Sequence, residues 1–353
     1  MAQINKPTDY FNTVLYTGNS STQSITGVGF QPDWVWCKSR SGADNHAIFD
    51  AVRGGQKQLR SNTTDAELTR TNAISSFDSD GWSMGSQPEM NSNTVTYASW
   101  NWLASNTTAS NTDGSITSTV SANTTSGFSI VSYTGTGANA TIGHGLGSLP
   151  GMVIVKGRNT TSTNHWFVFH QNSQSSYSAS GSAILLLNAI NAVDTIGVGG
   201  VWNNTSPTSS VFNIGTENGV NESGKDFIAY CFAEKKGFSK FGSYTGNGST
   251  DGPMVYLGFK PSYLLIKHYN GAGNEWEIYD NKRIGYNSAN YHLNAHDSTA
   301  EATLSNRIDF LSNGFKLRAG PSGPINTTGN NYIYMAFAES PLVGTNNTPA
   351  TAR

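Results

Sequence analysis

The chain has 353 residues, of which 12% are charged and 11% aromatic, with a formal net charge of −2 at pH 7. Disordered chains combine few aromatic residues with high charge, so this composition excludes intrinsic disorder. A nearly neutral chain also lacks the basic excess of a nucleic-acid-binding protein, and no apolar run of about 18 residues predicts a membrane span.

The N-terminal segment Met1–Val14 contains neither an apolar core nor a small-residue cleavage site. We therefore expect synthesis in a cytoplasm without a secretory signal peptide. The two cysteines, Cys37 and Cys231, lie inside apolar runs at non-equivalent places of the chain. This pattern predicts two buried thiols rather than a disulfide.

One set of motifs occurs three times along the chain. A Tyr-Thr-Gly triplet begins each copy, a proline follows, and a lysine lies six residues beyond that proline. Each copy closes on a run rich in aromatic residues. The triplets begin at Tyr16, Tyr133 and Tyr244, the lysines are Lys38, Lys156 and Lys267, and the closing runs are 97–102, 227–232 and 332–337.

This spacing divides the chain into three tandem domains. A period of about 110 residues is far longer than that of solenoid repeats, and each copy is long enough to hold its own core. We expect repeat one with an N-terminal docking segment at 1–105, a Ser/Thr/Asn-rich linker at 106–126, repeat two at 127–236, repeat three at 237–341 and a loose C-terminal tail at 342–353.

Short apolar runs separated by Gly, Asn and Asp predict antiparallel strands throughout. The fold class that fits is all-β, as three tandem antiparallel β-sandwiches of a jelly-roll or lectin-like kind, with an immunoglobulin-type sandwich as the alternative. Helical periodicity is scarce. Only residues 65–75 and, more weakly, 183–192 could form short helices.

Two sets of repeated residues allow more than one interpretation. The three lysines are either contacts to an anionic ligand or edge residues that block strand addition or extend from the sandwich to solvent, and we favour the second interpretation. The pairs Trp34/Trp36 and Trp100/Trp102 each share one face of a strand. Core packing is expected for at least one pair, and the other could stack on sugar rings or form a subunit interface.

The sequence predicts no catalytic residues, no metal site and no cofactor. Glycoside hydrolysis needs two carboxylates across a cleft, whereas Glu234 and Glu339 occupy equivalent strand ends, which indicates a structural position. His292 and His296 lie in a polar loop, without the clustered ligands of a zinc site. The segment Asp78–Gly81 lacks the distal Glu of a calcium loop and is better interpreted as a turn.

Repeat one resembles a domain family common in virion proteins of tailed phages, especially marine and cyanobacterial ones. The likeness covers nearly all of repeat one and is weaker in repeats two and three, and Asn101 departs from the small or Cys residue usual there. No catalytic residues are defined for that family. The segments that carry the resemblance are Tyr16–Asn19, Gly29–Trp36, Lys38–Arg40, Phe49–Gly54, Ser61–Thr64, Ser79–Trp82 and Tyr97–Trp102.

This resemblance implies a virion structural protein, most simply a tail fibre or receptor-binding protein that recognises a host-surface glycan or protein without catalysis. Its partners would be itself, as a homo-oligomer and most simply a homotrimer, and other virion proteins. One alternative is a capsid decoration, head-fibre or tail accessory protein with no receptor. A second alternative is a depolymerase of surface polysaccharide.

Binding of a glycan would use exposed aromatic side chains in polar loops. Four residues fit this description in the sequence. The expected ligand-binding residues are Trp82, Trp202, Tyr286 and Tyr291.

Overall fold

The computed structural model describes residues 3–160, 164–176, 183–193, 200–271, 273, 275–284, 286–320, 323–344 and 349–351. Its regular structure is almost entirely β-strand, and all named strands pair antiparallel, which confirms the all-β class. Both expected helices are wrong. Residues 65–75 contain short strands, and 183–192 contain a two-residue strand and turns, because pairing with neighbouring strands outweighs weak helical patterns.

The elements follow the chain in three similar series. Repeat one contains η1 (Pro7–Asp9), β1 (Phe11–Thr17), β2 (Gln23–Ile25), β3 (Trp34–Ser39), β4 (Ala47–Asp50), β5 (Lys57–Gln58), β6 (Leu68–Thr69), β7 (Ile74–Asp78), β8 (Gly81–Met84), α1 (Pro88–Asn91) and β9 (Thr96–Trp102). Next come β10 (Ala109–Asn111), β11 (Ser118–Asn123), β12 (Phe128–Thr134), β13 (Ala140–Gly143), β14 (Pro150–Gly157), β15 (Trp166–His170), η2 (Gln171–Ser176), β16 (Leu185–Leu186), β17 (Val211–Ile214), α2 (Asn218–Asn221) and β18 (Asp226–Ala233). Repeat three contains β19 (Ser239–Thr245), β20 (Met254–Tyr256), β21 (Phe259–His268), β22 (Trp276–Asp280), β23 (Ala289–Asn294), β24 (Ala302–Leu311), β25 (Gly314–Leu317) and β26 (Asn331–Pro341).

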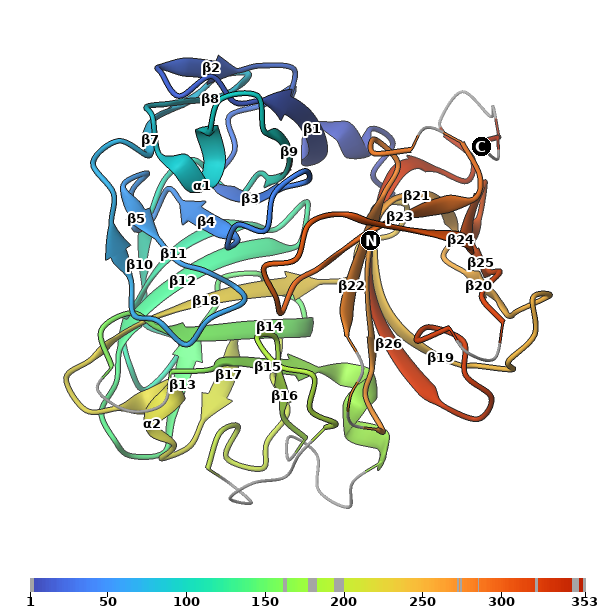
Figure 1. The fold of residues 1–353 in the computed structure, drawn as a ribbon. Coiled ribbons are helices and arrows are strands. Elements are labelled where there is room, and N and C mark those ends of the chain that lie inside the picture. Colours follow the sequence, from blue (N-terminus) through green and yellow to red (C-terminus); the bar gives the residue numbers. More distant parts are fainter. Residues whose placement is uncertain are drawn as a thin grey trace.

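The same strand order occurs once in each repeat. The main sheets contain the orders β1-β9-β3-β4, β12-β18-β14-β15 and β19-β26-β21-β22. A smaller group of strands accompanies each of them, namely β2-β8-β7, β13-β17 and β20-β25-β24. Figure 1 shows the repeats as three lobes around a common centre. The stretch 106–126 is part of this architecture, since β10 and β11 extend the main sheet beyond β12.

The Tyr-Thr-Gly triplet has one structural role in all three repeats. Its tyrosine stacks on the first aromatic residue of the closing run, and its hydroxyl donates to a backbone carbonyl before that run. A side chain on its glycine would lie within 2.4 Å of a backbone oxygen, so only glycine fits. The stacked pairs are Tyr16–Tyr97, Tyr133–Phe227 and Tyr244–Tyr332, with accepting carbonyls on Met90, Val220 and Ile325.

A fully buried asparagine follows each of those carbonyls. Each side-chain amide donates to two loop carbonyls and accepts from one loop N–H, which satisfies backbone groups that would otherwise be buried without partners. This repeated feature is not among those predicted from the sequence. The residues are Asn91, Asn221 and Asn326.

Apolar packing occurs at two levels. Each repeat has a hydrophobic cluster of its own, and a fourth cluster contains residues from all three repeats. The four tryptophans of the two expected pairs all lie in this shared core, at most 1% exposed. Trp34, for example, lies 4.5 Å from Tyr230 of repeat two, and Trp102 lies 5.7 Å from Tyr263 of repeat three, measured between ring centroids. Neither pair is therefore available to stack on a sugar.

Equivalent hydrogen bonds join each repeat to the next and close a ring. Each repeat donates one backbone hydrogen bond to the repeat that follows it, and repeat three donates the equivalent bond to repeat one. Backbone bonds link Glu67 to Arg158, Val193 to Tyr269 and Glu301 to Arg40. Ring nitrogens of Trp166, Trp276 and His46 bond the carbonyls of Arg60, Leu186 and Asn294. Head-to-tail contacts that close after three copies form a threefold ring.

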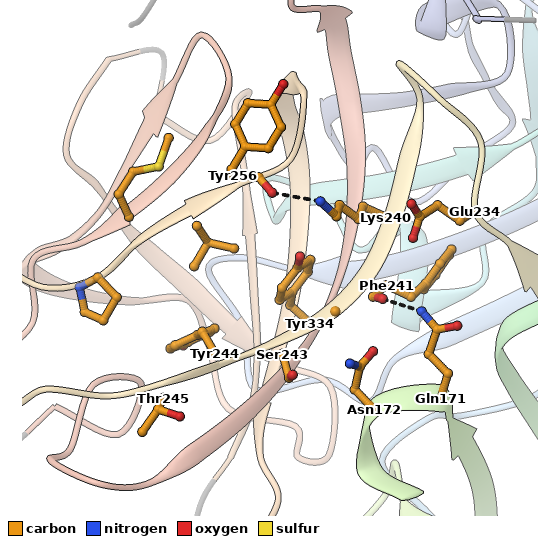
Figure 2. A pocket seen from close by; sticks show the side chains of 14 residues that line it. Gln171, Asn172, Glu234, Lys240, Phe241, Ser243, Tyr244, Thr245, Tyr256 and Tyr334 are labelled. Atoms are coloured by element: carbon orange, nitrogen blue, oxygen red, sulfur yellow. Dashed lines mark hydrogen bonds between the residues drawn. The ribbon is translucent and has the colours of Figure 1, made fainter. Parts of the chain in front are cut away.

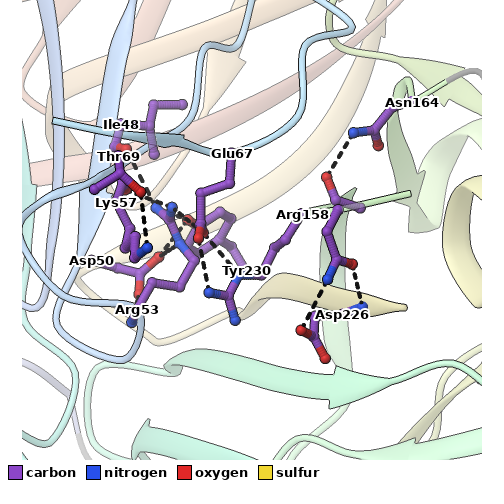
Figure 3. Close-up of polar contacts among 12 residues, drawn as sticks. Ile48, Asp50, Arg53, Lys57, Glu67, Thr69, Arg158, Asn164, Asp226 and Tyr230 are labelled. Carbon is purple, nitrogen blue, oxygen red and sulfur yellow. Dashed lines mark hydrogen bonds and ion pairs between the residues drawn. The ribbon is translucent and has the colours of Figure 1, made fainter. Parts of the chain in front are cut away.

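Buried ion pairs lie at two of the three junctions between repeats, which we call seams. At the seam between repeats one and two, Arg53 contacts Asp50 at 2.5 Å and Glu67 at 3.1 Å (Figure 3). Arg158 of repeat two contacts the same Glu67 at 2.8 Å. Burial alone would raise the pKa of Glu67. The hydrogen bonds from Arg158 and the charge of Arg53 outweigh that effect and hold the pKa of Glu67 below its ordinary value. The Tyr230 hydroxyl donates to Asp50, so this network also crosses the seam.

The three repeated lysines are buried, so the edge interpretation is wrong. Lys38, Lys156 and Lys267 lie on β3, β14 and β21, which are paired on both sides, and none has exposed surface. Lys156 donates to the carbonyl of Asn164 and lies 5.7 Å from the Trp166 ring centroid. Burial lowers the pKa of Lys38 to about 8 and that of Lys156 to about 7.

Replacing Lys156 by methionine is expected to stabilise the protein by roughly 1–3 kcal/mol at pH 6, because a buried cation is exchanged for an apolar chain. Burial lowers the pKa of Lys156 from 10.5 to about 7, so the folded state binds fewer protons between these values. The free energy of unfolding should therefore rise as pH increases from about 7 to about 10.5, and K156M should flatten that rise.

Urea titrations at several pH values measure both effects. Lys282, an exposed lysine after β22, provides the control K282M, which should change neither stability nor its pH dependence. A loss of stability in K156M at pH 6 would contradict the prediction.

Candidate functional site

Two of the four expected ligand-binding residues are buried. Trp82 lies in β8 with no exposed surface, packs on Tyr16 and donates from its indole nitrogen to Asn101. Trp202 is 3% exposed and packs against Phe169. Because both rings fill the cores of their own repeats, neither can contact a ligand in this structure.

The other two candidates both lie in repeat three. Tyr286 is 69% exposed in the loop between β22 and β23. Tyr291 is half-buried in β23, where it pairs with Thr303 of β24. Both rings lie outside the groove described next.

Two pockets at the seam between repeats two and three share Glu234 and Tyr256, and we call them together the seam groove. Their volumes are about 560 and 450 Å³. Tyr256 and Met254 of β20 are 55% and 42% exposed at the rim. The first pocket is completed by η2, β19 and Tyr334 of β26, and the second by the connection 235–239 and by residues 257–259.

The groove has a distinctive floor because one pair of opposed residues departs from the repeat pattern. Val14 faces Ser99 in repeat one, and Val131 faces Ala229 in repeat two. At the equivalent place Gly242 faces Tyr334, and a β-carbon on Gly242 would lie 2.3 Å from the tyrosine hydroxyl. The missing side chain on β19 thus leaves space for the Tyr334 ring, which borders the groove but is itself only 3% exposed.

Polar groups lie around this ring, as Figure 2 shows. The Lys240 amine donates to the Tyr256 carbonyl at 3.0 Å and lies 5.6 Å from the Tyr256 ring centroid. Gln171 donates to the carbonyl of Phe241 at 2.6 Å. Burial, reinforced by the charge of Glu234, raises the pKa of Tyr334.

The seam groove is suited to binding a polyhydroxylated ligand. Its volumes fall in the roughly 300–1,000 Å³ range of small-molecule sites, and it combines an exposed aromatic face with amide, hydroxyl and charged groups. Glu234, at an equivalent strand end to Glu339, contributes the one carboxylate among the lining residues. Glu234 is recognisable in the sequence as a repeated position, but the groove around it is not.

A second cluster, Glu275, His296 and Asp297, offers three ligand atoms within 4.8 Å of one another. The Trp276 N–H donates to His296 Nδ1 at 3.4 Å, which places the imidazole proton on Nε2, the atom facing Asp297 at 3.5 Å. Asp297 already accepts from Thr299 and Asn294. This arrangement favours a hydrogen-bonded turn over a cation. His292, the other histidine of this part of the sequence, is not in this cluster and packs against Tyr279.

The acidic segment at 78–81 is the turn between β7 and β8. The Asp80 carboxylate accepts from the backbone N–H groups of Gly27 and Gly29, and these two hydrogen bonds lower its pKa. The carboxylate therefore fastens the β7–β8 turn to the loop after β2.

Comparison with known families gives one finding. A family model described as a domain of unknown function (DUF7483) matches residues 6–341, so a single family domain spans all three repeats. No curated protein matches the chain. Within the described residues, no helix is long and apolar enough to cross a membrane.

Proposed function

Because the chain belongs to the DUF7483 family, whose description assigns no activity, we propose its function from its own features. We propose a phage virion structural protein of the tail-fibre or receptor-binding kind, which recognises a host-surface glycan in the seam groove without catalysis. The observation that carries the binding role is the groove beside Gly242 and Tyr334, where repeats one and two have Val14 facing Ser99 and Val131 facing Ala229 instead. The virion role rests on the resemblance of repeat one and on the low-charge, all-β character of the chain.

We also propose that each repeat is an antiparallel β-sandwich, with its main sheet facing the shared core and its smaller strand group facing outward. The hydrophobic cluster that belongs to each repeat would then be the core between the two sheets of its sandwich. This arrangement supplies threefold organisation within one chain. The single chain is then the threefold unit of the particle, in place of the homotrimer expected from the sequence.

Light scattering coupled to size exclusion is expected to give a mass near 37.7 kDa, because the ring already uses the head-to-tail faces of all three repeats. A mass about three times larger would instead support a homotrimer of chains, which would need surfaces outside the ring.

Two alternative functions make different predictions. A capsid decoration, head-fibre or tail accessory protein without a receptor would bind no host glycan, and antibody labelling of particles would place it away from the tail tip. A depolymerase would release new reducing ends from host polysaccharide. The single carboxylate lining the groove favours binding over hydrolysis.

Binding of the purified chain to an array of bacterial surface polysaccharides tests the proposal. The variant Y256A should weaken binding at least about tenfold, because it removes the exposed ring that both pockets of the groove share. Y286A removes an equally large exposed ring outside the groove and should bind normally. Loss of binding in Y286A alone, or no binding to any polysaccharide, would overturn the assignment of the groove.

A further inference from the structure

We infer that the ligand of the seam groove is an anionic saccharide, such as a uronic-acid-containing polymer, rather than a neutral one. This inference rests on the proposed function and specifies the ligand of the same site. The charges that line the two pockets carry it. Three lysines, Lys235, Lys236 and Lys240, line the pockets against one carboxylate, that of Glu234.

The lysines are placed for different tasks. Lys240 is half-buried, and one of its three donors is held by the Tyr256 carbonyl, which fixes the amine close to the exposed ring. Lys235 is mostly buried and donates to Ser148, so it mainly adds positive potential to the second pocket. Lys236 is exposed in the same pocket.

This arrangement fits the chemistry of a sugar acid. Its apolar ring face would lie on Tyr256, and its carboxylate would lie beside the Lys240 amine, which is 5.6 Å from the centre of that ring. The next sugar unit of a polymer would extend past Tyr256 into the second pocket, where Lys236 faces solvent. A neutral sugar would leave the excess of positive charge uncompensated.

The local charge of the groove lining is opposite in sign to the net charge of the chain. The formal net charge of the whole protein is −2 at pH 7, while the groove lining carries two more positive than negative side chains. Charge complementarity of this kind contributes specificity and depends on ionic strength.

The test compares binding of oligogalacturonate with binding of its carboxyl-reduced, neutral form by titration calorimetry at low and moderate salt. We expect the acidic form to bind at least about tenfold more tightly, with K240Q losing about tenfold and K236Q less, since a hydrogen bond to a charged group is removed. Added salt should weaken binding of the acidic form. K282Q removes one exposed positive charge outside the groove and should bind as the parent does.

The outcomes separate the two proposals. Equal affinity for acidic and neutral forms, with Y256A still impaired, would overturn the anionic ligand while the glycan-binding groove stands. Binding to neither form, together with no binding on the polysaccharide array, would overturn both. An equal loss in K240Q and K282Q would show a general charge effect and would also overturn this inference.

Discussion

Replacing Arg283 by methionine is expected to lower the free energy of unfolding by about 3–5 kcal/mol, because two carboxylates lose a buried partner. The Arg283 side chain has no exposed surface and contacts Asp280 at 2.6 Å and Glu301 at 3.3 Å. It also donates to the Ile278 carbonyl at 2.7 Å. Asp280 keeps one donor from repeat one, the Trp100 indole, which does not neutralise its charge.

Repeat two provides the control for this experiment. His170 and Ser173 occupy the places of Asp280 and Arg283, so the ring tolerates a seam without this ion pair when both residues are exchanged. The double variant D280H/R283S copies repeat two and should lose less stability than R283M, while S173A should lose no more than about 1 kcal/mol. Chemical denaturation measures all three. A loss below about 1 kcal/mol in R283M would show that the ion pair is not needed.

Replacing Trp34 by alanine is expected to cost about 3–5 kcal/mol and to shift the unfolding of the whole chain as one transition. Trp34 is 1% exposed, and its ring centroid lies 4.4 Å from that of Trp102 and 4.5 Å from that of Tyr230 in repeat two. It also stacks on Phe128. The cavity would therefore lie between two repeats, in the core that all three share.

Denaturation followed by tryptophan fluorescence and by far-ultraviolet circular dichroism tests this cooperativity. The variant W82A makes the same chemical change in the hydrophobic cluster that belongs to repeat one alone. It should also shift the single unfolding transition of the whole chain. Coincident curves from the two probes are expected for both variants. A biphasic curve in which part of the amplitude stays unshifted would indicate that the repeats unfold independently.

The residues that define the repeats are predictable from the sequence because their roles are local or recur at fixed spacing. Tyr16, Tyr133 and Tyr244 mark a stacking partner, and their glycines mark a close backbone approach. The burial of Lys156 was not predictable in the same way. A lysine near the end of a strand looks like an edge residue until its pairing with both β15 and β18 is known.

The site residues were predicted less well, for a physical reason. Trp82 follows a tight turn at Asp80 and was expected in a loop, but a two-residue turn places the next residue directly in a strand, where its ring enters the core. The seam groove depends on Gly242 and Tyr334, which are far apart in sequence. Alignment of the three copies would have shown both positions departing from their counterparts.

Under the proposed function, the ring within one chain would also set how many ligands the protein can hold. Three identical chains would present every surface feature three times, whereas three covalently joined copies are free to diverge. The groove built on Gly242 and Tyr334 therefore occurs once per ring. Under the proposed glycan-binding function, each copy would be monovalent for its ligand, and strong attachment would come from many copies displayed together, whose combined avidity exceeds the affinity of any one groove.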